Sequence, residues 1–330
     1  MTAATFAPLS PTTNADLSRI PILFNIHVEP DLRVIDFEKR RWMGYENLHT
    51  FLFKIRPAIE QATGRPVHFN WLFRLDWQIK KVYGDAAWAL KEYRSLVKEA
   101  RDSGDSLGVH VHAWRPKRVG LKRTWIADFS DHEWIASCVS LAHLAFVESI
   151  KEQPEIFSFG DHYISPEVLA QLERLGFRCD MSMHPGRPIL QRFVPEEESC
   201  GWLPSFLNTP RQAFKPTRNT LCKTDHDAIG LWEIPVSVGF LKSVHNPQIT
   251  EAHKLLFGMH FDQAQEIIEQ NLALTTPYLL AEMRSDVRLD DYNQMQFDRA
   301  VDYLMHHPLA KSMEFKTVSA HLDQLDLMTQ

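Results

Sequence analysis

Short apolar runs, rich in β-branched and aromatic residues, alternate along the chain with segments of helical spacing. The eight runs are Ile22–Val28, Val67–Phe73, Leu107–His112, Ile156–Phe159, Phe177–Met183, Leu231–Val236, Tyr278–Met283 and Met313–Val318. Strands that alternate with helices pair in parallel through right-handed crossovers. The sequence therefore predicts an α/β fold, a (β/α)-barrel of seven or eight parallel strands.

Capping residues mark the boundaries of the helices between these strands. A helix with the apolar positions of Leu48–Ile59 on one face is expected to end at Gly64, because glycine readily adopts the left-handed conformation that closes a helix. Ser165 and Pro166 are suited to the first positions of another helix, which Gly176 would close. These signals support the strand–helix alternation.

The chain of 330 residues is long enough for two domains, but α/β barrels commonly occupy this length as one unit. We expect residues 1–19 to be a flexible leader and residues 20–330 to form a single barrel domain. Residues 186–230 lack a clear period and are expected to be a long inserted loop. Loops of that length usually cover a site or bind a partner.

Composition argues against several classes of function. The net charge of −6 argues against a surface that binds nucleic acid, which needs clustered Lys and Arg. The first residues lack the pattern of a secretion signal, and no apolar run reaches the length of a membrane span. The four cysteines show no C-x-x-C spacing, so neither a zinc ribbon nor a redox motif is expected. These features predict a cytoplasmic protein without a membrane or nucleic-acid partner.

Polar side chains stand at the carboxyl ends of the predicted strands. Barrel enzymes carry their catalytic groups at this end, because the side chains there converge on one mouth. In chain order the polar residues are His27, Glu29, Arg74, Asp76, His110, His112, Asp161, His162, Glu233, Glu282 and Arg284. The sequence therefore predicts one active-site-like mouth.

Imidazoles and a carboxylate are the donors that Zn²⁺ and other first-row divalent ions accept. A metal site that leaves a position for water is a site for hydrolysis, with a nearby His or Asp moving the proton. Any one His-x-His pair, such as His110 and His112, is more often a polar pair at a barrel mouth. The convergence of several pairs makes the metal site and the merely polar mouth about equally good interpretations.

Several segments resemble the motifs of the polysaccharide deacetylase (NodB-homology, carbohydrate esterase 4-like) superfamily, in a divergent branch. Ile22–Asp31 resembles the first motif, and Gly104–Trp114 resembles the second, which carries the metal-binding histidines. Further similar segments are Phe159–Leu169, Leu175–Asp180 and Leu231–Val236. The resemblance spans roughly residues 20–320.

The resemblance implies roles for particular residues. Glu29 and His110 take metal-ligand positions, with His112 as the third ligand, and His27 stands where the family has its catalytic aspartate. Trp114 occupies the position of the second family histidine, and Arg284 stands near that of the late histidine that serves as general acid.

The candidate site residues follow from the strand-end positions and from the family resemblance. Proton transfer is expected from His27, Asp76, Asp161 or His162, and metal binding from Glu29, His110 and His112. Substrate binding is expected from Arg74, Trp114, Arg115, Glu233 and Arg284, with the arginines orienting an anionic substrate.

Three functions stay open. The first is a metal-dependent, deacetylase-like hydrolase of a C–N bond other than a peptide bond, acting on an N-acylated sugar or a related small molecule. Zn²⁺ is the expected ion, and a site without metal is the alternative. The second is an altered barrel that binds an anionic ligand or carbohydrate, or carries out a metal-independent reaction, at the same mouth. The third is an amidohydrolase-type metal barrel, which fits less well because His-x-His follows the third strand here. A homo-oligomer is compatible with each.

Overall fold

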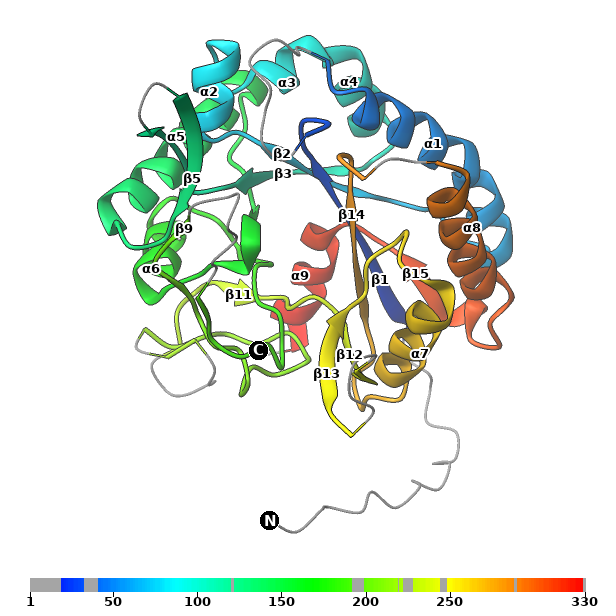
Figure 1. The fold of residues 1–330 in the computed structure, drawn as a ribbon. Coiled ribbons are helices and arrows are strands. Elements are labelled where there is room, and N and C mark those ends of the chain that lie inside the picture. The colour runs from blue at the N-terminus through cyan, green and yellow to red at the C-terminus, as the bar shows by residue number, and fades with distance from the viewer. Residues whose placement is uncertain are drawn as a thin grey trace.

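A computed structural model describes residues 19–32, 41–119, 122–191, 199–218, 220–221, 228–243, 248–287 and 290–328. Within these residues, eight strands form one parallel sheet in which the sequence-distant β1 and β14 are neighbours (Figure 1). They are β1 (Ile20–Val28), β2 (Asn70–Arg74), β3 (Ser106–Val111), β6 (Ile156–Phe159), β7 (Cys179–Asp180), β11 (Trp232–Glu233), β14 (Leu279–Arg284) and β15 (Met313–Phe315). Each predicted strand corresponds to one of these, so the barrel prediction is confirmed.

The strand order is β11-β7-β6-β3-β2-β1-β14, with β15 paired to the first residues of β1. The sheet curls into a half-barrel with helices on its outer side (Figure 1). Its two ends approach each other through Ser237, just beyond β11. The Ser237 amide donates to the carbonyl oxygen of Leu280 on β14 at 3.1 Å, and the Leu280 amide donates to Oγ of Ser237 at 2.9 Å. The barrel is therefore interrupted between β11 and β14.

Helices follow most of the strands and cover the outside of the sheet. They are α1 (Met43–Thr63), α2 (Trp77–Tyr83), α3 (Trp88–Glu92), α4 (Arg94–Asp102), α5 (His132–Ile150), α6 (Pro166–Arg174), α7 (Phe261–Leu272), α8 (Asp291–His306) and α9 (Val318–Met328). Two 3₁₀ turns, η1 (Gly160–His162) and η2 (Ala310–Ser312), complete the set in the described residues. Gly64 ends α1 with a φ of 74°, and Oγ of Ser165 accepts from the Val168 amide at the start of α6, so both predicted boundaries are confirmed.

One described helix, α5, is long and apolar enough by length and composition to cross a membrane. One face of it packs against the barrel, where Ile135, Cys138, Val139 and Phe146 are buried. Burial of this kind is what a helix covering a parallel sheet requires.

Three small sheets in the described part of the chain lie outside the barrel. They are the β4–β5–β9 sheet (Trp114–Val119, Lys122–Asp128 and Ser199–Cys200), the β8–β10 pair (Leu190–Gln191 and Trp202–Leu203) and the β12–β13 hairpin (Val238–Lys242 and Thr250–Lys254). The predicted loop at residues 186–230 contains β8, β9 and β10, while its residues 192–198, 219 and 222–227 lie outside the described residues. Most of the predicted leader, residues 1–18, also lies outside them.

Candidate active site

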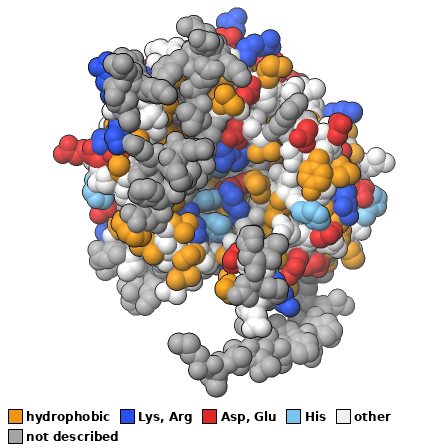
Figure 2. Space-filling model, in the orientation of Figure 1, with side chains coloured by type: hydrophobic (Ala, Val, Ile, Leu, Met, Phe, Trp, Pro, Cys, Tyr) orange, Lys and Arg blue, Asp and Glu red, His pale blue; other side chains and the backbone are white. Residues whose placement is uncertain are grey.

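The carboxyl ends of β1, β3, β6 and β14 surround a cavity of about 230 Å³. Figure 2 shows a hollow in this face of the molecule, with Lys, Arg and His side chains inside it. The predicted residues that line the cavity are His27, Glu29, His110, His112, Asp161, His162 and Arg284. The convergence expected from the strand ends is therefore present.

Glu29, His110 and His112 bring three donor groups together at the bottom of the site. Nε2 of His110 lies 3.1 Å from Nε2 of His112 and 3.6 Å from Oε1 of Glu29, and Nε2 of His112 lies 3.3 Å from Oε2 of Glu29. Ligands roughly 2.0–2.1 Å from a tetrahedral zinc ion are separated by about 3.3 Å. The spacing of these three groups fits a common divalent ion.

With both imidazole rings neutral, hydrogen bonding in this group leaves one contact between two acceptors. The carbonyl oxygen of Ser158 lies 3.0 Å from Nδ1 of His110, so this nitrogen carries the proton and Nε2 of the neutral ring is an acceptor. Nε2 of His112 must then donate to it, which leaves Nδ1 of His112 without a proton and 3.4 Å from Oδ2 of Asp161. A cation held by both Nε2 atoms and Glu29 removes the conflict, because Nδ1–H of His112 can then donate to Asp161.

The ionisation of these groups also suits a cation. Burial would raise the pKa of Glu29, but the charge of Arg284, 3.6 Å away, and the contacts with His110 and His112 hold it well below its usual value. Burial lowers the pKa of both His110 and His112, and the charge of Arg74 lowers that of His112 further. The group is therefore an ionised carboxylate with two neutral imidazoles, which are the protonation states that bind metal.

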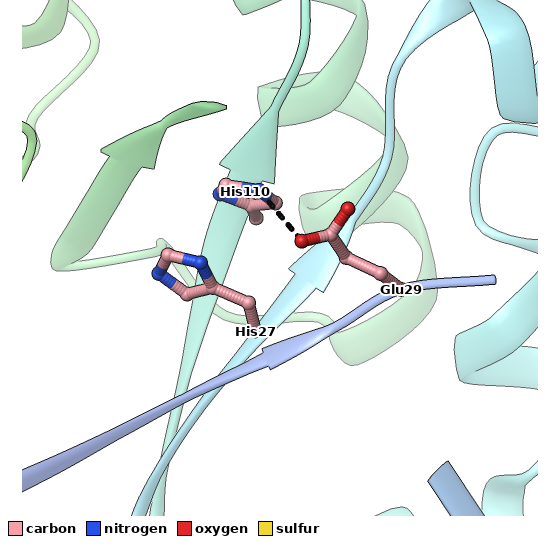
Figure 3. A group of neighbouring side chains, drawn as sticks. All are labelled: His27, Glu29 and His110. Atoms are coloured by element: carbon pink, nitrogen blue, oxygen red, sulfur yellow. Dashed lines mark ion pairs between the residues drawn. The ribbon is translucent and has the colours of Figure 1, made fainter. Parts of the chain in front are cut away.

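His27 adds a fourth buried donor beside this group. Figure 3 shows His27 and Glu29, from the end of β1, facing His110 on β3. One donor atom of each of these three residues lies within 4.8 Å of the others, and the rings of His27 and His110 stack at 4.2 Å. Burial and the neighbouring His110 lower the pKa of His27 well below its usual value. A neutral imidazole here can bind a cation or accept a proton.

The turn after β6 is held in an uncommon conformation against His112. Asp161 and His162 both have positive φ, 60° and 54°, which is unfavourable for residues with a Cβ. The guanidinium of Arg187 donates to the carbonyl oxygens of Asp161 and His162 at 2.9 and 2.7 Å and stabilises the turn. A Cβ on Gly160 would lie 2.2 Å from the ring of His112, so only glycine allows this approach.

Known proteins resemble this chain in fold and not in sequence. No family model matches the chain, and no curated protein matches it in sequence. A solved structure from Parabacteroides distasonis, named a glycoside hydrolase/deacetylase, superposes with a TM-score of 0.56 at 10% identity over 95% of this chain and 73% of its own. A structure from Mycobacterium smegmatis, named a polysaccharide deacetylase, gives 0.50 at 9% identity over 98% and 96%. The chain has the polysaccharide-deacetylase fold. The Puue allantoinase shares it, with a TM-score of 0.52 at 10% identity over 94% and 92%.

Arg74 and Asp76 lie behind the cavity of this deacetylase fold. Asp76 accepts from Nε of Arg74 at 2.7 Å, from the His112 amide at 3.1 Å and from the Gln78 and Ile79 amides at the start of α2. Nη1 of Arg74 lies 3.7 Å from Glu29 and is fully buried. The structure places the pair where it orients the end of β3 and the carboxylate of Glu29.

Besides Arg74, three further predicted substrate-binding residues do not line the cavity. Trp114 is buried behind His112, with its ring centroid 6.5 Å from that imidazole. Arg115 pairs with Asp128 and with Asp131 at the start of α5. Glu233 is fully buried beside Asp180 on the neighbouring strand β7 and accepts from the Met183 amide.

The cavity contains four ionisable residues that the sequence did not assign to the site. Glu282 is one of the polar residues at the end of a predicted strand, which is β14 in the structure. It is two residues before Arg284, and this spacing predicts that both side chains lie on the same face. Lys254, His184 and Arg187 come from segments outside the parallel strands, and no local pattern points to them. These segments reach the deacetylase-fold cavity only through tertiary packing.

Proposed function

We propose that this protein is a metal-dependent hydrolase that cleaves the C–N bond of an N-acyl group, on an amino sugar or a related small molecule. The hydrogen-bond conflict among His110, His112 and Asp161 carries this proposal, because a divalent cation beside Glu29 removes it. Solved structures with the same fold include proteins named as deacetylases, which supports a hydrolase of this kind.

Glu29, His110 and His112 are the residues that would hold the ion, and zinc is the first ion to test because the donors are imidazole and carboxylate. When bound, such an ion polarises a carbonyl oxygen and makes water a nucleophile near neutral pH. Nδ1–H of His112 then donates to Asp161, which fixes the ring. His27 is neutral and lines the cavity, so its imidazole can take the proton of the attacking water.

Metal content tests the proposal. The purified protein incubated with Zn²⁺ and desalted is expected to retain about one ion per chain, and Glu29→Gln and His110→Ala are each expected to lose it. His306→Ala removes an exposed histidine from the end of α8 and is the matched control, with metal content unchanged. Equal zinc retention by the wild type and the Glu29→Gln/His110→Ala double variant would falsify the site.

A second candidate is a barrel that binds an anionic ligand or reacts without metal. The position of Arg284 favours it, because a guanidinium stays protonated and cannot serve as the general acid that the resemblance places there. Nε and Nη2 of Arg284 bind Asp286 at 2.9 and 2.6 Å, which holds the side chain at the cavity. A wild-type protein that retains no zinc in the same experiment would favour this candidate.

A further inference from the structure

Lys254 is a cation of the cavity that the proposed chemistry does not use. It is the last residue of β13, on the hairpin that follows β11, and its side chain lines the cavity. Its ammonium forms an ion pair with Glu282 of β14 and lies 2.9 Å from Nε2 of His162. Through these two contacts the hairpin places a positive charge at the mouth of the barrel.

The hydrogen bonds of Lys254 leave one donor for a ligand. Nδ1 of His162 lies 2.9 Å from the carbonyl oxygen of Ser182, so Nδ1 carries the proton and Nε2 accepts from the lysine. Burial and the charge of Lys254 lower the pKa of His162 well below its usual value, which agrees with a neutral ring. Among the described residues, Glu282 and His162 take two of the three N–H groups of the ammonium, which leaves the third for a molecule in the cavity.

A second cation, Arg187, lies in the cavity wall together with Lys254. Arg187 lines the same cavity, and among the described residues its polar partners are the carbonyl oxygens of Asp161, His162 and Pro204 rather than carboxylates. His184, also in this wall, is neutral because burial lowers its pKa to about 3. Three carboxylates line the cavity among the described residues: Glu282 pairs with Lys254, Glu29 lies 3.6 Å from Arg284, and Asp161 lies 3.4 Å from His112.

The cavity of about 230 Å³ is smaller than the roughly 300–1,000 Å³ of sites for drug-sized ligands, which favours a small substrate. We propose that the wall formed by Lys254 and Arg187 binds a carboxylate of the substrate, which makes the substrate an N-acyl amino acid or a similar small acidic amide. This inference rests on the proposed hydrolase for the reaction, but the carboxylate site itself is independent of it. Phe159, Leu190 and Leu203, which also line the cavity, would contact the apolar part of such a molecule.

The test uses a probe that cannot be hydrolysed. In 4-oxopentanoate a CH₂ group replaces the amide N–H of N-acetylglycine, and hexane-2,5-dione, which has no C–N bond, is the uncharged match. Calorimetric titration of the zinc-loaded wild type is expected to show binding of 4-oxopentanoate at least about tenfold tighter than binding of the dione, the range of a charge-assisted hydrogen bond. Equal affinities, or no binding of 4-oxopentanoate, would overturn the inference.

Variants assign the preference to Lys254. Lys254→Met is expected to abolish it, and Lys254→Arg is expected to keep it. Lys254→Met leaves the carboxylate of Glu282 buried without its partner. The Lys254→Met/Glu282→Gln double variant removes that unpaired charge and gives a second measurement of the carboxylate preference. Lys242→Met, an exposed residue on the paired strand β12, is the matched control and is expected to retain the preference. A Lys254→Met protein that still prefers the carboxylate would also overturn the inference.

Failure of the two proposals can be told apart. Zinc binding without a carboxylate preference would leave the hydrolase standing and remove this inference. A carboxylate preference that depends on Lys254, in a protein that retains no zinc, would support this inference and remove the metal-dependent hydrolase.

Discussion

Replacing Gly160 by alanine tests whether the approach of the β6 turn to His112 sets the metal site. The added methyl would lie 2.2 Å from Cε1 and 2.3 Å from Nδ1 of His112. Non-bonded carbon atoms pack at roughly 3.5–4.0 Å, so the ring or the turn has to move by more than about 1 Å. Metal–ligand distances tolerate only about 0.2 Å, so His112 would no longer be a ligand in the present arrangement.

We expect Gly160→Ala to lower zinc affinity by at least about 100-fold, the upper end of the loss seen when groups that support a ligand are removed. Overpacking of this kind also lowers the free energy of unfolding by about 1–3 kcal/mol. Competition with a chromophoric chelator measures the zinc affinity, and chemical denaturation measures the free energy of unfolding.

Gly230→Ala is the matched control, because its φ is not positive and the added methyl would meet only Oε1 of the Glu173 side chain, at 3.3 Å. The control is expected to change neither the zinc affinity nor the free energy of unfolding appreciably. Zinc affinity within twofold of the wild type in a folded Gly160→Ala protein would refute the reasoning.

Two further predictions concern stability. Burial raises the pKa of Asp180 to about 6, and burial together with the adjacent Asp180 raises that of Glu233 well above its usual value. The folded state therefore keeps protons that the unfolded state releases near pH 4, and this contribution to stability is lost as the pH rises through about 6. The buried histidines act in the opposite direction, because their lowered pKa values destabilise the folded state at pH 5. Guanidinium denaturation should therefore show that the change in stability from pH 5 to pH 8 is more favourable in Glu233→Gln than in the wild type, because the variant lacks the loss at Glu233; an equal change would contradict the assignment. Asp131→Ala removes the side chain that accepts from the Trp134 amide at the start of α5 and should cost about 1 kcal/mol by the same method, whereas an unchanged midpoint would contradict the capping role.

The strands were predictable because each is a short, buried run that must cross the core. β6 matched its predicted bounds, Ile156–Phe159, since it is buried throughout and is followed by a glycine. β7 and β11 are only two residues long, although longer runs were predicted. Hydropathy describes burial well, but it does not show where hydrogen bonding to a neighbouring strand stops.

The site was predictable where it depends on periodicity within a strand. His27 with Glu29, and His110 with His112, are two residues apart, so the side chains of each pair share one face, and the parallel sheet brings both faces to one mouth. Glu233 obeys the same rule at the end of β11, yet it lies beside Asp180 and does not line the cavity. Strand-end position alone does not show whether a side chain faces the cavity or a neighbouring strand.

The interruption between β11 and β14 has a consequence for how such a protein can change over evolution. Ser237 joins the two ends of the sheet, and the β12–β13 hairpin that carries Lys254 begins at the next residue. The proposed ion ligands belong instead to β1 and β3, on either side of β2 in the continuous part of the sheet. The lysine of the proposed carboxylate site and the proposed ion ligands are thus on separate elements, so exchange of the hairpin is expected to change substrate choice while the proposed ion ligands stay in place.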